Sequence, residues 1–206
     1  MKTGGDPTSS LDALVLAAGA GARFGGGKLL APWRGGVLLG GALAAAFAAP
    51  ARKVTVVWGA DRRVADAANA WASAQGEEHR LVLVEAAAHA DGLSASLKAG
   101  LASLPPDSAG AFVFLGDMPR VPHTVLEPLA QALAGGAAAA APTFEGRRGH
   151  PVLLGKALFA QLAVLEGDRG AGALLTRLGP GLATVAAADD GVLYDVDRPE
   201  DLPAPA

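Results

Sequence analysis

Short apolar runs alternate along this chain with longer stretches that suit helices. Such alternation is typical of strand–helix–strand units, in which consecutive strands pair in a parallel sheet. The early runs are apolar almost throughout, as expected of strands that are covered by helices on both faces. We therefore predict the α/β class, with a mainly parallel sheet flanked by helices in a single domain.

The elements expected from these patterns are short, and their boundaries are set by glycine, proline and polar residues. The expected strands are 13–16, 53–57, 80–84 and 111–115, with weaker candidates at 137–141, 151–154 and 192–194. The expected helices are 38–48, 61–74, 93–104, 123–133, 157–165 and 171–178. The domain should span residues 11–202, between a frayed N-terminus at 1–10 and a short tail at 203–206.

Charge and composition exclude several classes of function. The chain has 17 Lys and Arg against 20 Asp and Glu, a net charge of −3, so it has no broad basic field to hold nucleic acid. It contains no cysteine, which excludes thiolate metal sites and thiol nucleophiles, and its four histidines show no metal-ligand spacing. No signal-like leader is evident, and the longest apolar runs, 41–51 and 137–142, are too short to span a bilayer. We expect a cytoplasmic protein that binds neither nucleic acid nor membrane.

The first expected strand leads into a glycine-rich loop, Leu16-Ala-Ala-Gly-Ala-Gly-Ala-Arg-Phe-Gly-Gly-Gly-Lys28. Glycine lets the backbone approach a ligand closely with several N–H groups, and Arg23 and Lys28 add two cations suited to a triphosphate. The spacing matches neither a P-loop nor the dinucleotide fingerprint, because Leu29 follows Lys28 and three residues separate Gly21 from Gly25. A flexible surface loop with two solvated cations is the alternative.

An acidic turn, Leu115-Gly-Asp-Met-Pro119, follows the fourth expected strand. A carboxylate in such a turn suits Mg²⁺, which takes one or two protein oxygens and completes its shell with water and phosphate. In the commonest doubly wound order the first and fourth strands are neighbours, so Asp117 should face the glycine-rich loop across one cleft. An ordinary turn or helix-capping aspartate is the alternative.

A second acidic segment, Tyr194-Asp-Val-Asp-Arg-Pro-Glu-Asp201, follows the last expected strand. Alternation in an extended segment places Asp195 and Asp197 on the same side, where both could address one cation. We expect Asp197, more than Asp195, to be the metal ligand. A capping role for either aspartate is the alternative.

Two further segments carry polar residues. Ser94 and Ser96 open an expected helix, where they could cap it or contact the ribose or base of a nucleotide. The segment 146–153 gathers Arg147, Arg148 and His150, a basic patch suited to an acceptor phosphate, unless it is a surface turn with a satisfied histidine.

Together these motifs resemble the molybdenum cofactor nucleotidyltransferases, and most closely the CTP:molybdopterin cytidylyltransferase branch. Five ordered segments carry the resemblance, which covers residues 14–202: Leu16-Ala-Ala-Gly with Arg23, Gly25 and Lys28-Leu-Leu; Gly92-Leu-Ser-x-Ser-Leu-x-x-Gly100; Gly116-Asp-Met-Pro; Gly149-His-Pro-Val; and Asp195-Val-Asp-x-Pro-Glu-Asp. The sequence departs from the family pattern at Phe24, where methionine is usual, and at Arg198, where threonine is usual.

The resemblance implies a Rossmann-like domain of the nucleotide-diphospho-sugar transferase type. It also implies Mg-dependent transfer of CMP from CTP to the phosphate of molybdopterin, with release of pyrophosphate. The implied catalytic residues are Arg23, Lys28 and Asp117. The other implied roles are base and ribose binding by Leu16, Ala17, Ala18 and Gly19, triphosphate binding by Arg23 and Lys28, metal binding by Asp117 and Asp197, nucleotide contact by Ser94, and acceptor binding by His150. Transient contact with a molybdoenzyme or its chaperone would follow from such a product.

Three other functions stay open at this point. The enzyme could use GTP on molybdopterin, it could act on a sugar phosphate, or the domain could bind nucleotide for regulation without turnover. Choosing the base depends on hydrogen bonds from loop backbone, which a sequence does not place. The sequence does not indicate an oligomeric state.

Overall fold

The computed structural model describes residues 10–59, 61–164 and 172–202, and these form a mixed sheet flanked by helices. Its strands are β1 (Leu11–Ala17), β4 (Val54–Trp58), β5 (Leu81–Glu85), β6 (Gly110–Leu115), β7 (Ala139–Phe144), β8 (Arg147–Arg148), β9 (Val152–Gly155) and β10 (Leu182–Ala186). A separate two-stranded hairpin is made by β2 (Pro32–Trp33) and β3 (Gly36–Val37). The α-helices are α1 (Leu39–Ala48), α2 (Arg63–Gln75), α3 (Leu93–Ala102), α4 (Leu126–Ala134), α5 (Phe159–Ala163) and α6 (Gly172–Arg177).

The strand order across the sheet is β10-β7-β9-β6-β1-β4-β5, with β8 pairing only with β7. All neighbouring strands of this order are parallel except β9, which runs antiparallel to both β6 and β7. The expected adjacency of the first and fourth strands is confirmed, because β1 pairs with β6 in parallel register from Leu11 opposite Gly110 to Leu16 opposite Leu115. The carboxyl ends of these two strands therefore open onto one edge of the sheet.

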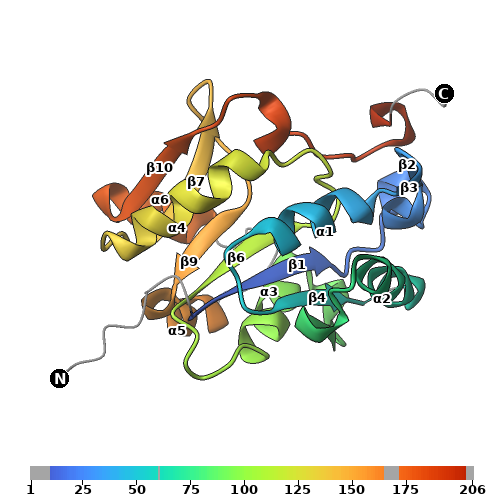
Figure 1. Ribbon diagram of the computed structural model, residues 1–206, viewed down its shortest axis with the longest axis horizontal. Helices are drawn as coiled ribbons and strands as arrows, with labels where there is room; N and C mark the ends of the chain where they lie inside the picture. Colours follow the sequence, from blue (N-terminus) through green and yellow to red (C-terminus); the bar gives the residue numbers. More distant parts are fainter. Residues whose placement is uncertain (1–9, 60, 165–171, 203–206) are drawn as a thin grey trace.

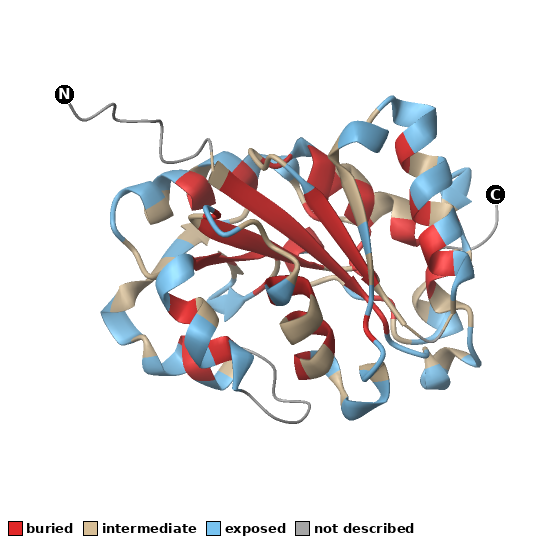
Figure 2. Ribbon diagram, turned by 90° about the horizontal axis from the view of Figure 1, so that it is seen from below, coloured by how far each residue is buried: buried red, intermediate tan, exposed pale blue. Residues whose placement is uncertain are grey.

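Two apolar cores lie on the two faces of the sheet. Helices α1, α2 and α4 cover one face, and α3, α5 and α6 cover the other (Figure 1). Because helices bury both faces, the central strands need apolar side chains in both directions, and all seven residues of β1 are buried. The strands form a buried layer between helices whose outer sides are exposed (Figure 2).

The structure corrects the prediction for the C-terminal third of the chain. The segment 192–194 is not a strand. Val192 is the last residue of a 3₁₀ turn, Asp190–Val192; it is buried, and its carbonyl accepts a hydrogen bond from the His150 N–H. The last strand is instead β10, an edge strand with alternating exposure that was not expected. The hairpin β2–β3 and the short β8 were also not expected. Leu165 and Ala171, which end and begin two expected helices, lie outside the described residues.

The other expected elements are confirmed within a few residues at their ends. Among the described residues, no helix is long and apolar enough to cross a membrane.

Candidate active site

The glycine-rich loop leaves the end of β1 and folds back on itself through two 3₁₀ turns, Ala22–Phe24 and Lys28–Leu30. Gly25, Gly26 and Gly27 have φ values of 85°, 94° and 64°, a conformation that side chains with a Cβ rarely adopt. A side chain at Gly21 would be crowded for a different reason, because a Cβ there would lie 3.1 Å from the Cβ of Lys28. The glycines thus allow the loop to fold back, so that Lys28 lies next to Gly21.

The acidic turn lies directly beside this loop. Gly116, the first residue after β6, donates its N–H to the carbonyl of Leu16 at 2.9 Å, and a Cβ on Gly116 would lie 3.2 Å from that same oxygen. Met118 closes the turn by donating its N–H to the carbonyl of Leu115. Asp117 is therefore held at the carboxyl edge of the sheet, next to the residues that begin the glycine-rich loop.

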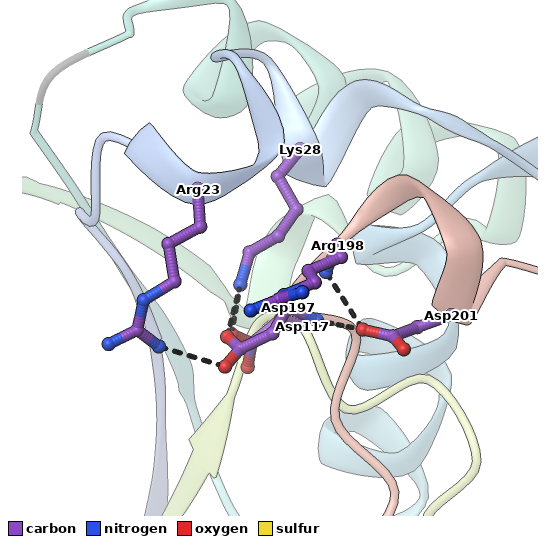
Figure 3. A network of polar contacts seen from close by, with 6 residues as sticks. All are labelled: Arg23, Lys28, Asp117, Asp197, Arg198 and Asp201. Carbon is purple, nitrogen blue, oxygen red and sulfur yellow. Dashed lines mark hydrogen bonds and ion pairs between the residues drawn. The ribbon is translucent and has the colours of Figure 1, made fainter.

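Three charged residues from these segments and one from the C-terminal segment form a connected cluster (Figure 3). The Lys28 ammonium contacts Asp117 at 2.7 Å and Asp197 at 3.6 Å, and the Arg23 guanidinium contacts Asp197 at 3.0 Å. The Lys28 and Asp117 side chains are only 13% and 25% exposed, so water screens their attraction weakly. Arg23 is 77% exposed, and its pair with Asp197 contributes little to stability.

The C-terminal segment is fastened to the acidic turn through its backbone. Val196 donates its N–H to the carbonyl of Asp117 at 3.1 Å, and Asp201 accepts the N–H groups of Asp197 and Arg198 at 2.9 and 2.8 Å. These two backbone hydrogen bonds lower the pKa of Asp201. Asp197 is consequently directed at Lys28 and Arg23 by main-chain contacts on both sides.

Asp195 lies two residues earlier, close to the same cluster. Partial loss of hydration, together with the charges of Asp197 and Asp117, raises the pKa of its carboxyl group. The three aspartates therefore repel one another, and a cation at this edge relieves that repulsion.

A cavity of about 280 Å³ opens beside the cluster. Its lining residues are Leu16, Ala18, Gly19, His89, Gly92, Leu93, Ser96, Leu115 and Asp117. Of the residues predicted to bind nucleotide, Leu16, Ala18 and Gly19 line this cavity, whereas Ala17 is buried outside its lining. Ser94 is also buried and does not line it; Ser96, two residues further along α3, does.

His89 is a residue of this cavity that the sequence reasoning missed. Its ring nitrogen Nδ1 lies 3.0 Å from the carbonyl of Ala86, and Gly59 allows the ring to approach, since a Cβ at Gly59 would lie 2.7 Å from it. In the sequence, the one feature that pointed to His89 was its position three residues before Gly92, the first residue of the motif that opens α3.

A second cavity of about 230 Å³ shares Leu16, Leu93 and Leu115 with the first and continues away from the charged cluster. Its remaining lining is apolar except for Arg148 and His150. The His150 Nδ1 atom lies 3.4 Å from the carbonyl of Val113, and burial lowers the pKa of the imidazole. His150 therefore lines the second cavity, which adjoins the cavity beside the charged cluster.

The donor set at the cluster fits a hard divalent cation. Within the described residues no group of three or more His, Asp or Glu side chains closes around an ion. However, Asp117 and Asp197 both direct an oxygen at one cationic nitrogen, that of Lys28, and Mg²⁺ or Mn²⁺ needs only one or two carboxylates when substrate phosphates and water complete the shell.

The fold and the site together define a nucleotidyltransferase: ligand cavities at the carboxyl ends of a mainly parallel sheet, a glycine-rich loop with a lysine, and carboxylates beside it. Residues 13–182 match the family model described as MobA-like NTP transferase domain, and the chain belongs to this family. A comparison with curated proteins found no match.

Solved structures extend this assignment. The Mycobacterium sp. JC1 homologue of Rv0371c is 29% identical, with a TM-score of 0.74 over 94% of this chain and 93% of that chain. Rv0371c of Mycobacterium tuberculosis, solved in complex with manganese, is 27% identical, with a TM-score of 0.74 over 93% and 95%. A nucleotidyl transferase of Methanothermobacter thermautotrophicus, Mth528, is 24% identical, with a TM-score of 0.71 over 93% and 94%, a likeness of fold.

Proposed function

We propose that the protein transfers CMP from CTP to the phosphate monoester of molybdopterin, with release of pyrophosphate and with Mg²⁺ or Mn²⁺ as cofactor. The observation that carries the proposal is the cluster in which the Lys28 ammonium lies between Asp117 and Asp197, beside a glycine-rich loop and a cavity. The motifs that resemble molybdopterin cytidylyltransferases support the choice of substrates. The manganese in the Rv0371c structure supports a divalent cation.

The reaction needs no protein nucleophile. An oxygen of the acceptor phosphate attacks the α-phosphorus of the nucleotide, the bond from that phosphorus to the bridging oxygen breaks, and pyrophosphate leaves. Catalysis then consists of alignment and of neutralising the charge that develops on the phosphates. Lys28 and Arg23 supply fixed positive charge from one side of the site. A Cβ at Gly25, Gly26 or Gly27 would meet no atom within 4 Å, so these glycines leave open space along the loop. The N–H groups of Gly25 and Gly26 donate within the loop, to the carbonyls of Ala22 and Gly21.

A divalent cation held by Asp117 and Asp197 would neutralise further charge on the phosphates. In this proposal each of the two adjoining cavities binds one of the two substrates. The cavity with Gly19, Ser96 and Asp117 suits the nucleoside, and the cavity with Arg148 and His150 suits the acceptor. In this proposal Ser96, which lines the nucleoside cavity, contacts the nucleotide.

Pyrophosphate release tests the proposal. The wild-type protein is incubated with each of the four nucleoside triphosphates and with molybdopterin or a sugar phosphate, in the presence of Mg²⁺, Mn²⁺ or EDTA. We expect release only with CTP, molybdopterin and a divalent cation. Release with GTP or with a sugar phosphate would replace the substrate assignment, and binding of Mg·CTP without release on any acceptor would point to a regulatory module.

A matched pair of variants belongs in this assay. Asp117→Asn and Asp107→Asn each remove one carboxylate that is paired with a basic side chain, at opposite ends of the sheet. Only Asp117→Asn should abolish release.

A further inference from the structure

A cavity of about 430 Å³ lies apart from the two cavities of the proposed active site and shares no lining residue with them. It is bounded by the hairpin β2–β3, the beginning of α1, Trp71 of α2, and the end of the acidic turn with the residues that follow it. Its lining residues are Trp33, Arg34, Gly36, Val37, Gly40, Gly41, Ala44, Trp71, Pro119, Arg120, Val121 and His123. We call it the Trp33 cavity.

The lining of the Trp33 cavity combines aromatic rings with cations and contains no carboxylate. Two of the three tryptophans of the chain, Trp33 and Trp71, are part of it. The guanidinium of Arg34 lies 5.5 Å from the ring centre of Trp33, and that of Arg120 lies 4.5 Å from the ring centre of Tyr194. Tyr194 itself lies outside the lining, so the cation–aromatic pair within the cavity is that of Arg34 with Trp33.

The two arginines differ in what balances their charge. Arg120 is paired with Asp190 at 2.8 Å. Among the described residues no ion pair involves Arg34, which sits at the tip of the hairpin with a φ of 46° and is followed by Gly35 with a φ of 82°. Such a turn favours Asn, Asp or Gly at its first position, so the positive φ of Arg34 is unfavourable for the backbone of an arginine.

Small residues keep the cavity open on the side of α1. Gly40, Gly41 and Ala44 present almost no side chain to it. Gly41 also allows α1 to approach the acidic turn, because a Cβ there would lie 2.4 Å from the carbonyl oxygen of Pro119. A Cβ on Gly40 would merely touch Trp71 at 3.5 Å, so the absence of a side chain at Gly40 leaves space in the cavity and is not demanded by packing.

We propose that the Trp33 cavity is a second binding site, for a small heteroaromatic phosphate such as a nucleoside monophosphate. Its volume lies within the range of small-molecule sites, roughly 300 to 1,000 Å³. The indole rings offer an apolar wall for a planar ring, and the guanidiniums of Arg34 and Arg120 suit a phosphate, which they can hold through paired N–H groups. This site is independent of the nucleotide site beside Lys28.

Tryptophan fluorescence tests this proposal directly. Trp58→Phe removes the one tryptophan outside the cavity, and the intact protein is then titrated with CMP, GMP, cytidine and inorganic phosphate. We expect saturable quenching by CMP or GMP, with cytidine and phosphate alone binding at least tenfold more weakly. Arg34→Asn, which keeps a residue that tolerates the turn, should weaken binding of the monophosphate at least tenfold. Gly40→Leu, which fills the cavity and leaves every charge in place, should do the same.

Two controls make the result decisive. Arg62→Gln removes an exposed arginine from the N-terminal end of α2, and Lys28→Met disables the proposed nucleotide site; neither should change the quenching. Quenching that is lost in Lys28→Met but kept in Arg34→Asn would place the monophosphate in the active site and overturn the proposal. Equal effects of Arg34→Asn and Arg62→Gln, or the absence of any saturable quenching by CMP and GMP, would also overturn it.

Discussion

At each end of the sheet a basic side chain lies between two aspartates. At the carboxyl end, Lys28 contacts Asp117 and Asp197. At the amino end, Arg52 contacts Asp12 at 3.0 Å and Asp107 at 2.7 Å. The composition of the two clusters is nearly the same, and their surroundings differ.

The amino-end cluster joins a buried aspartate, Asp12, to an exposed one, Asp107. The Asp12 side chain is 1% exposed, its Oδ1 has no hydrogen-bond partner, and Arg52 lines neither cavity of the proposed active site. Hydrogen bonds to Asp107 and to Asp12 raise the pKa of the Arg52 guanidinium, and the same contact lowers the pKa of Asp107. The carboxyl-end cluster borders a cavity, and its aspartates remain partly exposed. Because both clusters carry the same kinds of charge, our proposal for the carboxyl-end cluster rests on the cavity and the glycine-rich loop beside it.

The largest expected effect is that of Asp117→Asn on turnover. Removing one group that stabilises charge in the transition state typically costs about 10²- to 10³-fold in rate, and this residue is also a proposed metal ligand, so the loss should reach at least that range. Because Asp117 is partly exposed, the melting temperature should change little. Steady-state pyrophosphate release and thermal denaturation measure the two quantities; normal activity would reject the metal assignment.

Lys28→Met separates the two roles in the cluster. The methionine keeps the apolar stem and removes the charge, so we expect turnover to fall by about 10²-fold. Divalent-cation affinity should stay the same or increase, because Asp117 and Asp197 then lack their competing ammonium. Manganese titration alongside the rate assay checks this, and a parallel loss of cation affinity would contradict the separation.

Arg52→Met should have the opposite profile. It leaves Asp12 buried and unpaired, and breaking a buried pair costs about 3 to 5 kcal/mol. Since Arg52 is about one-third exposed, we expect on the order of 2 to 3 kcal/mol, measured by urea unfolding. Activity per folded molecule should equal that of the wild type; a loss of turnover without a loss of stability would break the contrast between the two clusters.

The smallest effect concerns His150 and pH. Burial lowers the pKa of this imidazole, so the unfolded chain takes up the proton first as the pH falls below about 6.5. The wild-type protein should therefore lose stability as the pH falls from about 6.5 toward the lowered folded-state pKa, and His150→Gln should flatten that part of the profile. Measuring the free energy of unfolding of both proteins across this pH window tests the prediction. Identical slopes against pH for the wild type and His150→Gln would show that His150 does not contribute to the pH dependence of stability.

The sequence predicted the central elements because their signals are local. The apolar runs of β1, β4 and β6, and the glycine-rich and acidic segments at their ends, needed only periodicity and turn chemistry. The adjacency of Lys28 and Asp117 followed from the usual order of strands in such a sheet. Strand β10 was missed because it is a half-exposed edge strand, and 192–194 was mistaken for a strand because its burial comes from contact with the His150 segment.

Within the site, the side chains that were hard to predict are those placed by tertiary packing. His89 reaches its cavity only because Gly59, far away in sequence, makes room for the ring. Ser96, and not Ser94, lines the same cavity because the first turn of α3 directs alternate residues to different sides. The Trp33 cavity assembles from four separate segments, and of its lining residues only Pro119 belongs to one of the sequence motifs.

The most direct test of the account is manganese binding, followed by electron paramagnetic resonance in the presence of CTP. We predict that Asp117→Asn and Asp197→Asn each weaken binding of Mn²⁺ at least tenfold, and that Asp107→Asn, the matched aspartate at the other end of the sheet, leaves it unchanged. Manganese binding as tight in Asp117→Asn as in the wild type would contradict the claim that the carboxyl-end cluster is the catalytic metal site.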